Sequence, residues 1–163
     1  METKNGSSRT LSIFAAVFVL AAVIISLFGI ITVKGNSGMI AIPTDVLIGG
    51  GEVVAKEPLG ITSISYAVNV PILISAQLCL LSFLACLLSG GSKKTSAIAL
   101  SFLFLTLIAV CLTGTFVHLA NPAIPLSSVG FTRAFFLTVC GMVMALLLEV
   151  LSLIMAKPIQ KGA

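Results

Sequence analysis

Glu149 is the one acidic side chain in the stretch Met144–Lys157. Apart from Glu149 and the final Lys, the residues of this stretch are hydrophobic or small. A charge within hydrocarbon costs free energy, so an intramembrane carboxylate is a functional-site hypothesis by default. One interpretation is a site that binds a proton or a cation. The other is a protonated or hydroxyl-bonded Glu that fixes how helices meet. We favour this second interpretation, because no other intramembrane charge is available to form a relay.

The depth of Glu149 suggests which residues surround it. It lies eight residues before Lys157, which places it ~12 Å inside the inner membrane boundary at a rise of ~1.5 Å per residue. Counting the same depth on neighbouring apolar segments brings Ser82 and Thr106 to its level. The sequence therefore predicts a buried polar site of Glu149, Ser82 and Thr106, with Glu149 mostly protonated at neutral pH.

Three further polar side chains are secondary candidates. Asn69 and Gln77 lie eight residues apart with Pro71 between them. They could line a polar pocket, although hydrogen bonds between helices explain them at lower cost. His118 is the only histidine. As a haem ligand it would need a second axial group, so we expect it to bond to a loop instead.

The four cysteines offer no recognisable site. All lie in apolar segments and no Cys-x-x-Cys occurs, which argues against a zinc knuckle or a thiol–disulfide motif. We expect them to be small packing residues. With no nucleophile–base pair or phosphate loop visible either, we expect no catalytic residues, no metal, no cofactor and no enzymatic activity.

The composition indicates that the elements positioning these residues lie in a membrane. Of the 163 residues, 58% are hydrophobic and only 9% are charged, whereas soluble domains average about 25% charged residues. No basic run with interleaved aromatics favours nucleic acid. We therefore predict one domain, residues 1–163, in contact with the lipid bilayer. Four segments reach the ~20 apolar residues that a span needs: Leu11–Val33, Tyr66–Ser89, Thr95–Leu119 and Ala134–Ala156.

Small residues recur along each segment at spacings of three and four. In membranes such stripes mark helix contacts, and a mean period near 3.5 favours a left-handed bundle. The predicted fold is therefore an all-α, left-handed four-helix membrane bundle. The stripes are Ser12, Ala15, Val19, Ala22, Ser26 and Gly29; Ser75, Cys79, Ser82, Cys86 and Ser89; Thr106, Ala109 and Thr113; and Gly141, Ala145, Glu149, Ser152 and Ala156.

The basic residues at the span ends predict the orientation. Lys4, Arg9, Lys93, Lys94, Lys157 and Lys161 fall on one side, and Lys34, Lys56 and Arg133 on the other. The side richer in Lys and Arg is normally cytoplasmic, so both termini are expected there.

Two connections are then expected to lie outside. In the outer loop 34–65, the segment PTDVLIGGGEVVAKEP predicts a short β-hairpin turning at Gly49–Gly51, although an irregular loop fits equally well. The second outer link, Ala120–Arg133, is too short for a domain.

This layout resembles tetraspan families of the claudin and MARVEL kind, with four spans, termini inside and strands in the first outer loop. The Trp and Cys motif of the claudin first loop is absent, since the chain has no Trp and no cysteine in that loop. The expected function is that of a structural or scaffolding component, or an accessory subunit, in a homo-oligomer or larger membrane complex. The alternative is a small oligomeric proton- or cation-coupled transporter or channel using Glu149. A membrane enzyme is the third possibility. It is kept because size and span count are similar to those of the membrane-bound glutathione transferase group.

Overall fold

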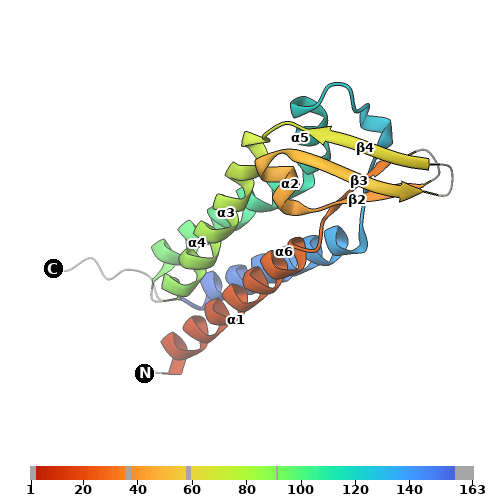
Figure 1. The fold of residues 1–163 in the computed structure, drawn as a ribbon. Helices are drawn as coiled ribbons and strands as arrows, with labels where there is room; N and C mark the ends of the chain where they lie inside the picture. The colour runs from red at the N-terminus through yellow and green to blue at the C-terminus, as the bar shows by residue number, and fades with distance from the viewer. Residues whose placement is uncertain (1–2, 36–37, 58–59, 91, 157–163) are drawn as a thin grey trace.

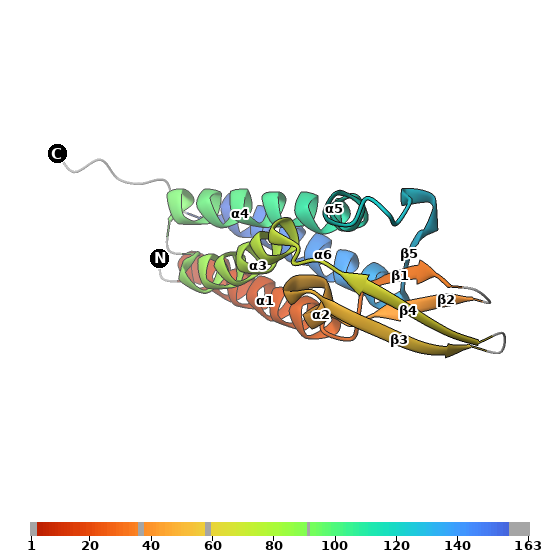
Figure 2. The ribbon, with the colours of Figure 1, turned by 45° about the horizontal axis from the view of Figure 1, so that its top comes forward.

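Four long helices form an elongated bundle, and all the strands gather at one end of it (Figures 1 and 2). The computed structural model describes residues 3–35, 38–57, 60–90 and 92–156. The elements are α1 (Thr3–Ser26), β1 (Ile31–Lys34), β2 (Met39–Ile42), α2 (Thr44–Gly49), β3 (Gly51–Glu57), β4 (Gly60–Tyr66), α3 (Val70–Leu88), α4 (Lys93–Cys111), α5 (Thr113–Ala120), the 3-10 helix η1 (Leu126–Ser128), β5 (Val129–Phe131) and α6 (Arg133–Met155). We call the end where α1 begins and α6 ends the terminal end, and the opposite end the sheet end.

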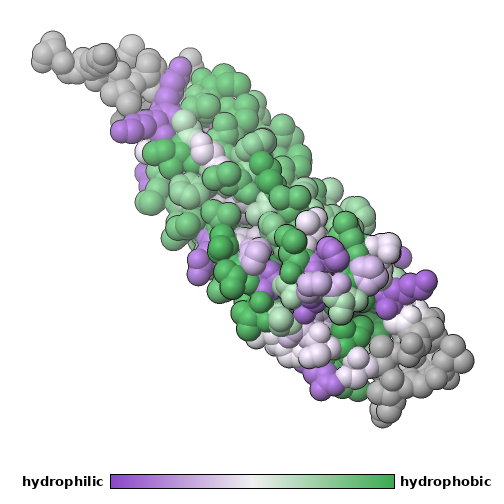
Figure 3. Space-filling view, turned by 90° about the horizontal axis from the view of Figure 1, so that it is seen from above, coloured by the Kyte–Doolittle hydropathy of each residue, from purple (hydrophilic) through white to green (hydrophobic). Residues whose placement is uncertain are grey.

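Four segments are long and apolar enough to cross a membrane: Gly6–Ser26, Val70–Leu88, Lys93–Cys111 and Arg133–Met155. Their mean hydropathies are 2.2, 2.3, 1.9 and 2.4. Hydrophobic side chains cover much of the bundle surface in Figure 3, while hydrophilic ones gather towards its ends. The prediction of a four-span membrane protein is confirmed at this level. Lys157 and Lys161, used to predict the orientation, lie outside the described residues.

The predicted limits of two spans were wrong at the sheet end. The first helix ends at Ser26, and Ile31–Lys34 is a strand instead of the last turn of a helix. Gly29, with φ +83°, turns the chain between them. Tyr66, the predicted start of the second span, is the last residue of β4. Hydropathy cannot separate a buried strand from a helix when the two adjoin, because both are apolar.

The third span is also interrupted. The predicted continuous helix Thr95–Leu119 separates into α4 and α5 at Leu112. The Thr113 hydroxyl donates to the backbone carbonyl of Val110 at 2.7 Å, and Gly114 follows it. A side chain bonded into the helical ladder next to a glycine is a recognised cause of such a break.

The outer segments form two small antiparallel sheets. One has the strand order β2-β1-β5 and the other pairs β3 with β4. In the first, Thr32 lies opposite both Ala41 of β2 and Gly130 of β5. β5 therefore joins the second outer link to the first, an arrangement that the sequence did not predict. The fold is mainly helical, but it is not all-α.

The predicted hairpin turning at Gly49–Gly51 was wrong in its first arm. Thr44–Gly49 forms helix α2, which begins after Pro43, and Gly51 opens the first strand of the β3–β4 hairpin. Proline fits the start of a helix because its fixed φ suits the first turn and its missing N–H is not needed there. Gly50, at φ +75°, ends the helix; a Cβ there would lie 2.9 Å from the Tyr66 carbonyl oxygen.

The small-residue stripes largely face the interior, as predicted. Ala15, Val19 and Ala22 of α1 are fully buried, or nearly so, against α6. Gly141 of α6 approaches α1 closely: a Cβ there would lie 3.3 Å from the Ala22 Cβ and 3.4 Å from the Phe18 carbonyl oxygen. Leu, Ile, Val and Phe side chains cover the outward faces. The left hand of the bundle stays a prediction.

Candidate functional site

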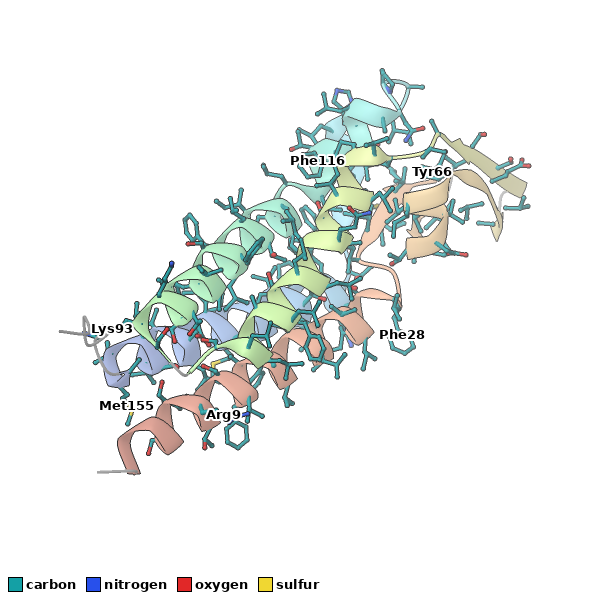
Figure 4. All side chains as sticks on the ribbon, turned by 90° about the vertical axis from the view of Figure 1, so that its left-hand side faces the viewer. Arg9, Phe28, Tyr66, Lys93, Phe116 and Met155 are labelled. Atoms are coloured by element: carbon teal, nitrogen blue, oxygen red, sulfur yellow. The ribbon has the colours of Figure 1, made fainter. Side chains whose placement is uncertain are left out.

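Glu149 lies fully buried inside the terminal end of the bundle. Five serines surround it or continue the network around it, and each is at most 3% exposed. They come from four different places: α1, the residue after α3, α4 and α6. We call this group the Glu149–serine cluster; it consists of Glu149, Ser8, Ser12, Ser89, Ser96 and Ser152. Figure 4 shows oxygen atoms gathered between the helices near Lys93, at the end that also holds Arg9 and Met155.

Hydroxyl-to-hydroxyl contacts connect the cluster. Ser89 donates to Oε1 of Glu149 through a short hydrogen bond. The Ser89 hydroxyl also lies 3.0 Å from that of Ser96 and accepts from Ser12 at 3.3 Å. Ser152 closes the network, since its hydroxyl lies 2.8 Å from that of Ser12 and 2.9 Å from that of Ser8. All four spans are thus tied together through side-chain oxygens.

The backbone around Gly90 brings Ser89 into the bundle. Gly90 has φ +84°, and a Cβ there would lie only 2.5 Å from the Cα of Arg9. The chain can therefore turn tightly against α1 directly after Ser89. On the other side of the turn, Ser92 and Thr95 form a capping box that starts α4, so that Ser96 falls on the inward face of its first turn.

One carboxylate oxygen of Glu149 is left without a partner. Among the described residues nothing makes a hydrogen bond to Oε2, although the atom is buried. Ser12 and Ser96 also lie near enough to interact with the carboxyl group. An ionised carboxylate in this position would carry an uncompensated buried charge, which is costly unless it is paired.

The predicted neighbours of Glu149 were wrong. Ser82 and Thr106 are both buried, but they bond to each other, with their hydroxyls 2.8 Å apart. Glu149 bonds to Ser89 instead, seven residues further along the chain than Ser82, or about 10 Å at ~1.5 Å per residue. The prediction counted residues inward from the end of each span and assumed that all four spans end at the same depth. In the structure Gly90, just after α3, packs against Arg9, which lies inside the end of α1. Three of the serines, Ser12, Ser89 and Ser152, were already on the predicted stripes.

Asn69 and Gln77 do not line a common polar pocket, and of the two only Asn69 makes the hydrogen bond between helices that was favoured instead. Asn69 is 1% exposed and caps α3: its Oδ1 accepts from the Ile72 N–H at 3.1 Å, and its Nδ2 donates to the Phe116 carbonyl at 2.8 Å. Gln77 is exposed on the outside of α3. The two residues therefore have separate environments.

His118 bonds to a loop, as expected. Its Nδ1 lies 2.7 Å from the carbonyl oxygen of Ile124 in the connection after α5, so this nitrogen carries the proton. The contact holds the connection that leads to β5. Of the cysteines, Cys86 is buried and Cys79 partly buried, whereas Cys111 and Cys140 are exposed on the outer surface.

A small cavity of about 50 Å³ lies between the helices towards the sheet end, with Ala22, Ser75, Thr113 and Met142 among its lining residues. The hydroxyls in its wall are bonded to backbone carbonyls, for example Ser75 to Pro71 at 2.8 Å and Thr113 to Val110. Its volume suits a few waters and is far below the ~300 Å³ of ordinary ligand pockets. The strongest candidate site is therefore the Glu149–serine cluster.

Comparison with known protein families, with curated proteins and with solved structures finds no match to this chain. The class of protein thus rests on its own features: a multi-pass membrane protein with four apolar helices and a small β layer at one end.

Proposed function

We propose that the protein is a self-associating structural component of its membrane, and that α3 forms the contact between copies. The observation that supports this proposal is the position of Gln77. Its side chain is exposed and makes no hydrogen bond to the described residues. It lies seven residues after Val70, so it is roughly 10 Å into the helix at ~1.5 Å per residue.

An amide facing hydrocarbon requires a partner. Moving an amide from water into hydrocarbon without a hydrogen bond costs roughly 4–8 kcal/mol. A glutamine has both a carbonyl acceptor and an NH₂ donor, so two copies related by a two-fold axis satisfy one another. Such isologous contacts are the commonest form of oligomer.

The surroundings of Gln77 suit a helix contact. Leu73, Leu80 and Leu84 are exposed on the same face, 39%, 57% and 51% respectively. With Gln77 they follow spacings of four, three and four, the pattern that packs knobs into holes between two helices. A single polar residue within such a seam fixes its register. The α3 face therefore combines a packing surface with one specific bond.

The sheet end offers a second surface for larger assemblies. The described β3 and β4 pair only with each other, so each has an open edge of backbone groups that another strand could join. Val54 of β3 and Val68, just after β4, are also exposed, 61% and 59%. We propose that this projecting hairpin contacts partner proteins of the complex.

Self-association is tested by comparing three full-length proteins in liposomes at several protein-to-lipid ratios. Gln77→Leu should weaken the dimer about tenfold, because membrane hydrogen bonds contribute roughly 0.6–2 kcal/mol and two are lost. Gln77→Asn keeps the amide and should retain most of the association. Ser101→Leu is the matched control, since Ser101 is exposed on α4 but bonds to its own helix, donating to the Ala97 carbonyl at 3.0 Å.

The readout is energy transfer between labelled copies, supported by disulfide cross-linking of Gln77→Cys on a cysteine-free background. A wild-type protein that stays monomeric at all ratios would refute the proposal. So would a Gln77→Leu protein that associates as well as the wild type.

A small cation-coupled transporter is the second candidate function, and the unpaired Oε2 of Glu149 is the observation that favours it. Liposomes holding the purified protein should then show cation-driven flux that Glu149→Gln abolishes. Gln keeps the size of the side chain but cannot carry a charge. If Glu149 does not couple transport, Gln is tolerated and no flux appears in the wild type.

A further inference from the structure

The Glu149–serine cluster combines one buried carboxylate with several oxygen atoms that carry no charge. Glu149 is 0% exposed, its Oε1 accepts from Ser89, and no described group bonds to its Oε2. If Glu149 is ionised, a single positive charge must sit beside Oε2. If it is protonated, either Oε1 carries the proton and donates it to the Ser89 hydroxyl, or Oε2 carries it, for which no hydrogen-bond partner is described.

We propose that this cluster binds one small monovalent cation, Na⁺ or the similar Li⁺, in competition with a proton. The carboxylate of Glu149 supplies the charge, and the hydroxyl oxygens of Ser12, Ser89 and Ser96 supply further ligands. This site is independent of the α3 contact proposed above.

The chemistry of the oxygens selects this class of ligand. Ca²⁺ takes six to eight oxygen ligands, usually with several carboxylates, and Mg²⁺ keeps most of its waters. One fully buried carboxylate balances one positive charge only. The Ser89 hydroxyl lies 3.3 Å from that of Ser12 and 3.0 Å from that of Ser96, so the three can face a single small ion.

The cluster also has a short route to the surface. A surface depression of about 270 Å³ at the terminal end is lined by Arg9, Leu87, Leu88 and Ser89, and Ser89 is the residue bonded to Glu149. Ser89 thus lies between this depression and the carboxylate, and a cation entering from there would have to displace the Ser89 hydroxyl.

The charged and titratable groups near this route oppose the cation or leave it unaffected. Arg9 of α1 lies at the mouth, and Lys93 and Lys94 begin α4 close by. Cys86 of α3 is buried near Glu149. Because the three basic side chains repel a cation, we expect binding to be weak. We expect the affinity to increase as the pH rises, because the proton then competes less for Glu149.

Carbodiimide labelling tests the site directly in the full-length protein in detergent. Dicyclohexylcarbodiimide reacts with protonated carboxyl groups in apolar surroundings, and mass spectrometry measures its adduct at Glu149. With Na⁺ at twice its Kd, mass action leaves about a third of the sites free, so labelling should slow about threefold. Li⁺ should protect similarly, whereas choline at equal ionic strength should not.

Thermal unfolding followed by circular dichroism gives a second readout. Na⁺ should raise the Tm of the wild type relative to choline, because a ligand that binds only the folded state stabilises it. Glu149→Gln and Ser89→Ala should lose this rise. Ser82→Ala is the control that should keep it, since Ser82 is equally buried but pairs with Thr106.

Wild-type protein decides the question even if a variant does not fold. Protection by Na⁺ in either readout supports the site. Equal labelling and equal Tm in Na⁺ and choline would overturn the proposal and leave Glu149 as a proton-bearing structural residue.

Discussion

Gly90 is the residue on which the geometry of the Glu149–serine cluster most directly depends. Its φ of +84° is unfavourable for any residue with a Cβ, and its Cα faces the backbone of Arg9. Because Ser89 directly precedes it, a shift of the turn would withdraw the hydroxyl that Glu149 accepts from. The buried carboxylate thus depends on a glycine outside the cluster.

Replacing Gly90 with Ala should destabilise the protein by roughly 1–3 kcal/mol through backbone strain alone, and by more through the clash with Arg9. Thermal unfolding in detergent measures the effect. Gly6→Ala is the control: it lies within α1 with nothing within 4 Å of the added Cβ, so helix propensity should make it neutral or slightly stabilising. Equal melting of the two variants would contradict the assigned role of Gly90.

Tyr66 should titrate abnormally late. Burial raises the pKa of its phenol from 10.0 to about 12, and its hydroxyl has no described partner. Since the unfolded chain ionises first as pH rises above 10, folding stability should fall between pH 10 and about 12. Tyr66 is the only tyrosine, so the ultraviolet absorbance of tyrosinate reports it alone.

The control for this titration is the chain in denaturant, where the midpoint should return to about 10. Tyr66→Phe should fold normally and lose this component of the alkaline destabilisation. A native midpoint near 10 would mean that the sheet end admits water to the phenol.

At the level of elements, Asn69 connects three segments at the sheet end. It caps α3, its side chain holds the last turns of α5 through the Phe116 carbonyl, and its own N–H donates to Ile48 of α2 at 3.2 Å. One residue, through its side chain and its backbone N–H, therefore sets where the second span begins and how the outer helices sit on it.

Asn69→Ala should lower the free energy of unfolding by roughly 2 kcal/mol, as the sum of a lost cap, about 1 kcal/mol, and the lost side-chain bond to the Phe116 carbonyl, about 0.5–1.5 kcal/mol. Asn69→Ser should lose only the second part, because Ser is a good cap but is too short to reach Phe116. Chemical unfolding curves of the two variants make the comparison. Identical losses would show that the bond to Phe116 contributes nothing.

The elements also show what the sequence could predict. The four helices were found because about twenty apolar residues in a row have few other structures available. The stripes correctly predicted that Ala15, Ala145 and Glu149 face inward, since spacing alone decides the face of a helix. The strands were missed or misplaced: β1 adjoins a span and is equally apolar, and β5 is three residues long and forms only by pairing with β1.

The site was predictable in part for a similar reason. The burial of Glu149 could be predicted from its position on the small-residue stripe. Its hydrogen-bond partners could not, because they depend on where each helix ends. The sequence gives no direct measure of the tight packing between Gly90 and Arg9, which sets that depth. Ser82 and Thr106 were correctly placed level with each other, because both lie well inside their helices.

At the scale of the whole molecule, the two ends differ in composition and should lie on opposite sides of the membrane. The terminal end holds Lys4, Arg9, Lys93 and Lys94 among its described residues, and the sheet end holds Lys34, Lys56 and Arg133. The terminal end has the larger number of Lys and Arg residues in the sequence, which favours a cytoplasmic location for that end.

This orientation predicts the labelling of two single-cysteine variants made after all four native cysteines are replaced. Glu52→Cys on β3 should react with a membrane-impermeant maleimide added to the non-cytoplasmic side of sealed membranes. Lys94→Cys at the start of α4 should react only after permeabilisation. Both positions are exposed, so a reversed result would reverse the orientation.

The pairing of α1 with α6 has a consequence for how the chain is made. Helix α1 packs along α6, which is synthesised much later, and β1, which follows α1, pairs with β5, which precedes α6. Until α6 is synthesised, α1 has no described partner for Ser8 and lacks the Ser152 contact of Ser12. Packing around α1 is therefore completed only after α6 has been made, and a nascent chain stalled before α6 would leave the hydroxyls of Ser8 and Ser12 without their Ser152 partner.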